Sequence, residues 1–165
     1  MIYTKTVPSP LGELLLAGEG KSLLGLWMEG QKYYGGKYHD MKPGELPVLE
    51  KASRWLERYF AGGRPDPGEL EIKPGGTEFQ RLIWGLLLEI PYGQTVTYGY
   101  LAKEAAKHLG CATMSAQAVG SAVGRNPISV VIPCHRVLGA RGSLTGYAGG
   151  LERKQWLLNF EGTLF

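Results

Sequence analysis

The chain has 165 residues, of which 44% are hydrophobic and 20% are charged, and its formal net charge is +3. This composition is typical of a globular protein with one large domain or two small ones. No apolar run approaches the ~18 residues that a membrane-spanning helix needs, and the first residues lack a signal-peptide core, so we expect a cytoplasmic protein that does not bind membranes.

The cysteines and histidines argue against disulfide and metal chemistry. The two cysteines, Cys111 and Cys134, form no disulfide framework and no Cys-x-x-Cys pair. The three histidines are scattered along the chain, and His39 and His108 are expected on the surface without a special role. We therefore expect no metal site and no cofactor.

The first part of the chain predicts a small domain built on an antiparallel sheet. Short apolar segments at 3–7, 14–17 and 23–28 are separated by turn residues, while 35–44 is polar and predicts a loop. A helix is expected from Pro47 to about Phe60, because apolar residues recur there at helical spacing. Pro74-Gly75-Gly76 then marks a boundary, which gives an amino-terminal domain of residues 1–75 and a second domain of residues 76–165.

The second domain is expected to be helical. Thr77 is a candidate cap for a helix to about Glu89, and further helices are expected at 98–106 (fading near Gly110), 115–123 and 151–160. The two middle helices, joined by a turn, fit a helix-turn-helix, although many helix pairs bind nothing. Residues 139–150 form a Gly-rich loop that lacks the spacing of a nucleotide-binding motif and more simply shapes a pocket.

The net charge lies wholly in the second domain. Residues 1–75 carry ten basic and ten acidic side chains, which cancel, whereas residues 76–165 carry eight basic and five acidic ones, which leaves +3. No acidic residue lies between Glu104 and Glu152. A surface of one sign favours a polyanionic partner, although an ordinary solvated face would look the same.

The expected helix at 115–123 is rich in small residues, among them Gly120 and, just beyond it, Gly124. Glycine weakens a helix, so backbone surface here is expected to come close to something. Close packing against a neighbouring helix and close approach to a nucleic-acid groove both explain this composition, and the sequence leaves the choice open.

The stretch Ile132-Pro133-Cys134-His135-Arg136 follows an apolar run, residues 128–132, that is typical of a buried strand. A thiol reacts as its thiolate, and nearby positive charge lowers the thiol pKa, so Cys134 is a candidate reactive group. On adjacency alone, a structural cysteine buried at a strand end explains the pattern as well.

Several motifs in order resemble the O6-alkylguanine-DNA alkyltransferases, which are methylated-DNA–protein-cysteine methyltransferases. The Pro-Cys-His-Arg core is the most specific piece. The matching segments are Pro91-Tyr92-Gly93 with Thr97-Tyr98, Ala118-Val119-Gly120, Asn126-Pro127, Ile132 to Val137, Gly146-Tyr147-Ala148-Gly149-Gly150, and Lys154 to Gly162 with Trp156 and Glu161.

This resemblance implies an α+β fold, with a ribonuclease-H-like amino-terminal domain followed by a helical winged-helix/helix-turn-helix domain. It implies direct-reversal DNA repair, in which an alkyl group passes from O6 of guanine, with O4 of thymine as a further candidate, to Cys134, irreversibly and once per molecule. By resemblance, His135 relays the thiol proton through a water, Glu161 orients His135, and Asn126 braces the segment before the cysteine.

The resemblance also implies a monomer that binds double-stranded DNA through the minor groove and flips the damaged base, because a thiol cannot reach the alkyl group in a stacked duplex. The expected base-pocket residues are Tyr98, Val123, Val137, Tyr147, Ala148 and Gly149. The expected DNA contacts are Tyr98, Gln117, Ala118, Gly120, Ser121, Arg125 and Arg136.

Two departures from the family pattern stand out. Gln117 occupies the position where members usually carry an arginine that fills the gap left by the flipped base, which predicts weaker duplex binding. The segment 107–114 looks about five residues longer than the usual turn, and Cys111 within it is expected to be incidental.

Two other functions fit parts of this pattern. An alkyltransferase-like protein that binds lesions with weak or no transfer is the main alternative, although the presence of Cys134 argues against it. A cysteine hydrolase is disfavoured, because adjacent residues on an extended chain point to opposite faces and no oxyanion-hole motif is evident.

Overall fold

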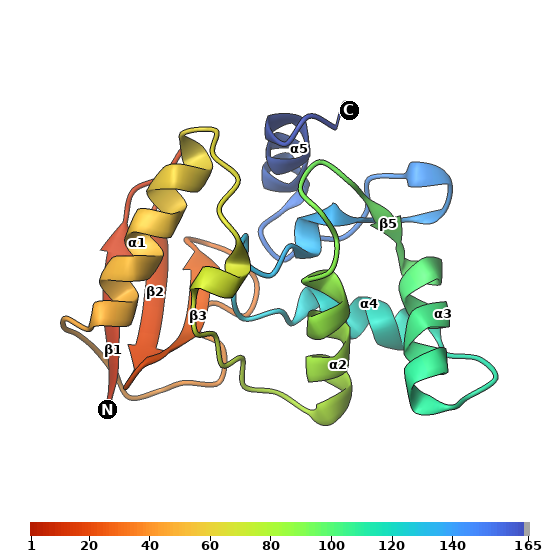
Figure 1. Cartoon of the computed structure of the whole chain (residues 1–165), viewed down its shortest axis with the longest axis horizontal. Helices are drawn as coiled ribbons and strands as arrows, with labels where there is room; N and C mark the ends of the chain where they lie inside the picture. Colours follow the sequence, from red (N-terminus) through yellow and green to blue (C-terminus); the bar gives the residue numbers. More distant parts are fainter. Residues whose placement is uncertain (164–165) are drawn as a thin grey trace. The chain divides into compact units, whose positions relative to one another are not determined.

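The computed structural model describes residues 1–163 (Figure 1), which divide into two compact units. The first unit is Met1–Gly75 together with Pro127–Ser129. The second is Gly76–Asn126 together with the chain from Val130 onward. Among the described helices, none is both long and apolar enough to cross a membrane.

The first unit is a four-stranded sheet covered by one long helix (Figure 1). Strands β1 (Ile2–Val7), β2 (Leu14–Glu19) and β3 (Ser22–Met28) pair antiparallel in the order β3-β2-β1, as predicted. Helix α1 (Pro47–Phe60) has the predicted bounds and buries its apolar side, including Trp55 and Leu56, over β2 and β3. A short 3-10 helix, η1 (Pro67–Glu69), follows it.

The predicted loop at 35–44 contains a strand that the sequence analysis missed. Strand β4 (Met41–Pro43) lies at the edge of the sheet and pairs parallel with β1, so the sheet is mixed and not purely antiparallel. Its three residues, Met-Lys-Pro, are too few to show an alternating pattern. Proline is tolerated there because an edge strand can leave one side unpaired.

The segment Pro127–Ser129 completes the other edge of this sheet. The Leu26 amide donates to the Pro127 carbonyl at 2.8 Å, and the Ser129 amide donates to the Leu26 carbonyl at 3.0 Å. These two bonds belong to a single parallel bridge between Leu26 and Ile128. The chain thus returns to the amino-terminal sheet for three residues between Asn126 and Val130.

The expected strand at 128–132 is therefore wrong. Only Ile128 pairs, and Val130 adopts a left-handed conformation with φ +70°, which is uncommon for a β-branched residue. The segment is a buried turn, not a strand, and its apolar composition reflects burial. Periodicity alone could not separate these possibilities in so short a run.

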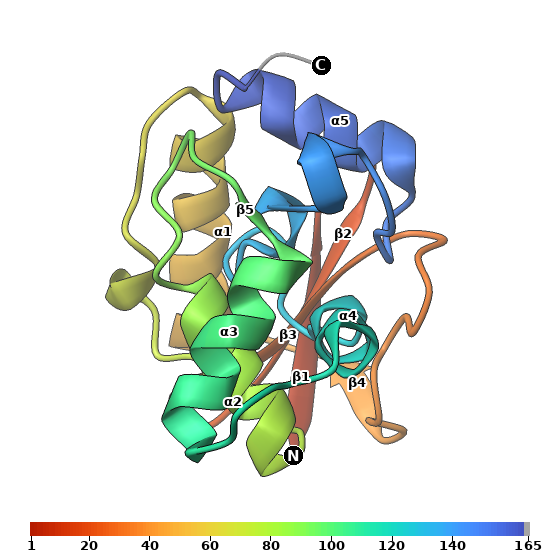
Figure 2. The same cartoon turned by 90° about the vertical axis from the view of Figure 1, so that its right-hand side faces the viewer.

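Helices α2 (Glu78–Leu87), α3 (Tyr98–Leu109) and α4 (Ala116–Gly124) form the core of the second unit (Figure 2). Thr77 caps α2 as predicted, whereas Ser115, expected as the first residue of its helix, is the residue that caps α4. Gly110 ends α3 in a left-handed conformation. The Trp84 indole donates to the Ala122 carbonyl at 2.8 Å, which fixes α2 against α4.

The remaining elements of the second unit carry the candidate site. Strands β5 (Val96–Thr97) and β6 (Val137–Leu138) pair parallel, and the 3-10 helices η2 (Cys134–Arg136) and η3 (Ala140–Gly142) flank β6. Helix α5 (Leu151–Phe160) matches its predicted bounds and contacts η2.

Candidate active site

Cys134 lies at the start of η2 and is almost fully buried, with an exposed fraction of 5%. Because Cys134, His135 and Arg136 form a helical turn and not an extended chain, the opposite-face argument against a hydrolase does not apply. All three side chains are buried in the second unit, so their partners decide what the turn can do.

Glu161, at the end of α5, binds both residues that follow the cysteine. Its Oε2 lies 2.8 Å from His135 Nε2, and its carboxylate receives two bonds from Arg136, Nε to Oε1 at 2.7 Å and Nη2 to Oε2 at 3.0 Å. Arg136 Nη1 donates further to the Ile90 carbonyl at 2.7 Å. Although burial would raise the pKa of Glu161, the bonds from His135 and Arg136 outweigh it and hold that pKa well below its usual value.

This network keeps the His135 imidazole neutral. Burial lowers the pKa of His135, and the nearby charges of Arg136 and Lys154 lower it further, against the opposing effect of Glu161. A neutral imidazole whose Nε2 proton is donated to Glu161 has a free lone pair on Nδ1. Nδ1 is buried and has no hydrogen-bond partner among the described protein atoms, so it is available as a proton acceptor.

The Cys134 thiol is uncharged at rest. Burial raises its pKa, and Asn126, Lys154, the backbone and Tyr147 partly reverse this effect by favouring the thiolate. Asn126 also donates through Nδ2 to the Ile132 carbonyl at 2.7 Å, which holds the turn that leads to the cysteine. Asn126 therefore contacts both the reactive group and the segment that carries it.

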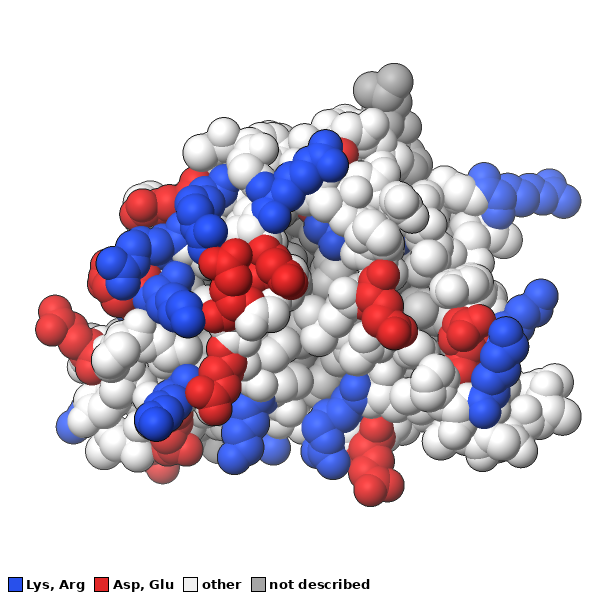
Figure 3. All heavy atoms as spheres, in the orientation of Figure 1, with Lys and Arg blue, Asp and Glu red and all other residues white. Residues whose placement is uncertain are grey.

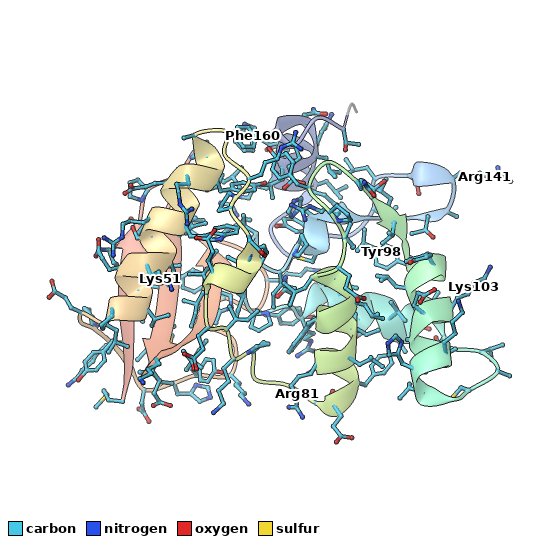
Figure 4. All side chains as sticks on the ribbon, in the orientation of Figure 1. Lys51, Arg81, Tyr98, Lys103, Arg141 and Phe160 are labelled. Carbon is cyan, nitrogen blue, oxygen red and sulfur yellow. The ribbon has the colours of Figure 1, made fainter. Side chains whose placement is uncertain are left out.

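Two tyrosines lie beside the thiol. Burial raises the pKa of Tyr147 well above its usual value, and its hydroxyl has no well-aligned hydrogen-bond partner among the described residues. Tyr98, at the start of α3 (Figure 4), is half-buried, and burial followed by the nearness of Cys134 raises its pKa. Both hydroxyls are thus neutral donors close to the cysteine.

Lys154 on α5 is a further buried residue of this site, and its place in the motif from Lys154 to Gly162 did not by itself predict that. Its side chain is fully buried, and Nζ donates to the carbonyls of Thr145 at 2.6 Å and Gly146 at 2.9 Å. Burial lowers the pKa of Lys154 to about 8. A lysine three and four positions before the buried Leu157 and Leu158 shares their helix face, and this spacing could have revealed it.

Comparisons with known proteins identify the family. A model described as 6-O-methylguanine DNA methyltransferase, DNA binding domain, matches residues 78–163, and one described as its ribonuclease-like domain matches residues 1–74. The chain belongs to the 6-O-methylguanine DNA methyltransferase family. The predicted family and the predicted two-part fold class are both confirmed.

Relatives cover nearly the whole chain. The methylated-DNA–protein-cysteine methyltransferase of Haemophilus influenzae is 44% identical over 97% of this chain and 86% of its own length. That of Methanosarcina acetivorans is 44% identical over 98% and 99%. Among solved structures, Mycobacterium tuberculosis OGT in complex with DNA matches with a TM-score of 0.83 at 41% identity, covering 96% of this chain and 92% of that one.

In this member of the family, the candidate DNA contacts on α4 lie on an open face. Gln117, Ser121 and Arg125 are exposed, and Ala118 and Gly120 are half-buried. A Cβ atom added at Gly120 would meet only the Tyr98 ring, at 3.9 Å, and one added at Gly124 would meet nothing within 4 Å. Close packing against a neighbouring helix therefore does not explain these two glycines.

Arg136 is the one predicted DNA contact that the structure contradicts. Its exposed fraction is 7%, and its guanidinium is committed to Glu161 and the Ile90 carbonyl. A phosphate could not reach it without breaking a buried ion pair. The basic surface inferred from the acid-free segment thus rests on exposed residues such as Lys107, Arg125 and Arg141, the last of which is labelled in Figure 4.

The predicted pocket residues divide by depth. Val123 and Val137 are buried, whereas Ala148 and Gly149 are half-buried in the loop that carries Tyr147.

Within the described residues, no group of three or more histidine, cysteine, aspartate or glutamate side chains could hold a metal ion. On α1 of the first unit, basic and acidic side chains are intermixed (Figure 3), in keeping with the balanced charge of residues 1–75.

Proposed function

We propose that this protein repairs O6-alkylguanine in double-stranded DNA by taking the alkyl group onto Cys134, irreversibly and once per molecule. The observation that carries the proposal is the buried Cys134 beside a neutral His135 whose second ring nitrogen is fixed by Glu161. This is the arrangement of a nucleophile, a base and an orienting carboxylate. The names of the relatives support the same activity.

The transfer is a displacement at the alkyl carbon. The sulfur lone pair forms the new S–C bond while the C–O6 bond breaks and its electrons pass to guanine. The proton lost from the thiol returns to guanine, so the products are a thioether and an intact guanine. A thioether is a poor leaving group, and the protein is therefore consumed.

We propose that His135 Nδ1 takes the thiol proton through a water. Buried nitrogens are normally hydrogen-bonded to protein or to ordered water, and Nδ1 has no protein partner among the described atoms. Glu161 fixes Nε2, so the lone pair of Nδ1 keeps its direction. Asn126 holds the turn before Cys134, and Tyr147 and Tyr98 supply donors that stabilise the departing guanine.

We propose that α4 enters the minor groove. Small side chains and open glycines let the helix backbone approach closely, and the exposed Arg125 supplies a phosphate contact. Gln117 fills the space of the flipped base, and Tyr98 acts on the adjacent phosphate. The pocket for the flipped base is formed by Tyr98, Val123, Val137, Tyr147, Ala148 and Gly149.

We further propose that residues 76–165 carry DNA binding and transfer, with residues 1–75 as a supporting domain. We propose that the protein acts as a monomer, since contacts within the chain join His135 to Glu161 and Asn126 to the turn before Cys134. Transfer from O4-alkylthymine would use the same displacement.

The substrate is DNA, so we propose that the protein acts in the compartment that contains the DNA, which in a cell without a nucleus is the cytoplasm.

The deciding experiment uses an oligonucleotide duplex that contains O6-methylguanine. After incubation, the Cys134 peptide should gain one methyl group in stoichiometric yield, whereas Cys111→Ala should react like the unmodified protein and Cys134→Ala should not react. Binding of the duplex without methylation would support the alternative, an alkyltransferase-like lesion-binding protein. The residue that favours this alternative is Gln117, which stands where family members usually carry an arginine.

A further inference from the structure

We propose that Lys154 is the counter-ion of the Cys134 thiolate and the anchor of the loop that carries Tyr147. Lys154 is buried in the second unit, at a position the transfer chemistry described above does not use. This inference rests on the proposed function for its biological meaning, but its test does not require DNA.

The first observation is a buried cation without a carboxylate partner. Nζ donates to two backbone carbonyls, Thr145 and Gly146, and within residues 1–163 no carboxylate lies at ion-pair distance from it. An ammonium group buried in this way is costly unless an opposite charge is near. Glu161, the buried acid among the described residues of this unit, is already neutralised by Arg136.

The second observation is which groups surround the ammonium. The Tyr98 ring centroid lies 5.9 Å from Nζ, and Cys134 is close enough for their charges to interact. The other titratable groups near this cluster are Tyr147, His135, Arg136, Arg153 and Glu161. Both tyrosines are neutral because burial raises their pKa values, so the thiolate that forms when Cys134 loses its proton is the anion that Lys154 can balance.

The positive charge of Lys154 lowers the pKa of both Cys134 and His135. A positive charge there favours the thiolate of Cys134 and disfavours the imidazolium of His135. A proton that leaves Sγ is therefore not retained on His135 and is passed on to the departing guanine. By holding the carbonyls of Thr145 and Gly146, the same ammonium also sets the position of the loop at Tyr147.

The test compares the unmodified protein with Lys154→Gln, which can still donate a hydrogen bond but carries no charge. Alkylation of Cys134 by iodoacetamide, followed by mass spectrometry of its peptide over a range of pH, gives the thiol pKa without DNA. The midpoint should rise by about one pKa unit in Lys154→Gln, so the rate at pH 7 should fall roughly tenfold while the high-pH plateau is kept. Lys103→Gln, which removes an exposed lysine, should change neither.

An unchanged midpoint in folded Lys154→Gln would overturn the proposal and leave Lys154 a purely structural anchor. Should that variant fail to fold, the reverse coupling can be measured in protein labelled with ¹³C at lysine Cε. Lys154 is the lysine with a pKa of about 8, and Cys134→Ala should lower that pKa, because coupling between two sites is reciprocal. An equal Lys154 pKa in both proteins would refute the counter-ion role. Failure of methyl transfer from DNA, with these shifts present, would count against the proposed function alone.

Discussion

Arg136 and Glu161 form a bidentate ion pair inside the second unit, with Nε–Oε1 and Nη2–Oε2 distances of 2.7 and 3.0 Å. The arginine two positions after Cys134 is therefore committed to the carboxylate that also binds His135. This pair leaves the Glu161 charge balanced before any proton moves. Because the pair is buried, its loss should lower the free energy of unfolding more than the loss of the other contacts in the site.

Arg136→Met is expected to lower the free energy of unfolding by about 3–5 kcal/mol, because it leaves a buried carboxylate without its cation. Urea unfolding at pH 7 measures this change. Adding Glu161→Gln to Arg136→Met should recover part of the loss, since the uncompensated charge is then gone. Arg58→Met, which breaks an exposed ion pair with Glu69, should have a much smaller effect, and equal losses in the two single variants would contradict this account.

Stability is expected to fall as the pH drops below about 6.5, the usual pKa of histidine in an unfolded chain. The pKa of His135 is lowered in the folded protein, chiefly by burial, so on acidification the unfolded chain takes up this proton first. The loss continues until the pH reaches the folded pKa. The urea midpoint should thus be lower at pH 5.5 than at pH 7.5.

This pH dependence has a matched pair of variants. His108→Gln, which changes an exposed histidine, should keep the full drop between pH 7.5 and 5.5, whereas His135→Gln should flatten it. A drop of the same size in His135→Gln would assign the effect to other groups.

Tyr147→Phe is expected to slow the reaction of Cys134 at pH 7 roughly threefold, as a rise of about half a pKa unit in the thiol would do. The hydroxyl favours the thiolate, and the substitution removes it. Stability should change little, because the hydroxyl makes no well-aligned hydrogen bond with the described residues. The rate of Cys134 alkylation by iodoacetamide against pH measures the shift without a guanine leaving group, and Tyr100→Phe, at an exposed position, is the control.

Gln117→Arg is expected to speed repair of duplex DNA about tenfold, the effect of one added charge-assisted hydrogen bond of ~1.5 kcal/mol. Gln117 is exposed on α4, so the longer side chain meets no obstacle in the protein. The reaction with free O6-benzylguanine should not change. Unchanged repair of the duplex would show that Gln117 does not limit binding or base flipping.

Gly120→Ala is expected to stabilise the fold by up to about 1 kcal/mol while weakening DNA binding, since alanine favours a helix but its methyl group would stand in the proposed groove contact. The new methyl group would meet the Tyr98 ring at an ordinary 3.9 Å. Gly85→Ala on α2, where an added Cβ also finds open space, is the matched control and should stabilise without affecting DNA binding. Duplex binding by Gly120→Ala as tight as that of the control would remove α4 from the interface.

Local features of the sequence predicted much of the fold. The cap at Thr77, Pro47 at the first turn of α1 and the apolar spacing of α5 predicted the bounds of these helices to within about two residues, because caps and periodicity act over one or two turns. Strand β4 and the turn at Val130 were not predicted, since both depend on pairing with segments far away in the chain.

The site was predictable only in part for the same reason. Cys134 and His135 stand out by adjacency, but His135 and Glu161 are 26 positions apart, and only the family resemblance brought them together. Arg136 was misassigned to DNA because a surface role is the usual one for arginine. Its burial follows from the position of α5, which no local pattern shows.

The return of the chain to the amino-terminal sheet at Pro127–Ser129 has a consequence for dissecting the protein. A fragment that begins at Gly76 would keep Asn126 and Cys134 yet lack Leu26, the backbone partner of both Pro127 and Ser129. A single cut before Gly76 would therefore leave the second unit without the backbone partner of the connection at Pro127–Ser129. Leu26 holds the backbone of the connection between Asn126 and Cys134, and a shortened protein would have to replace that backbone partner.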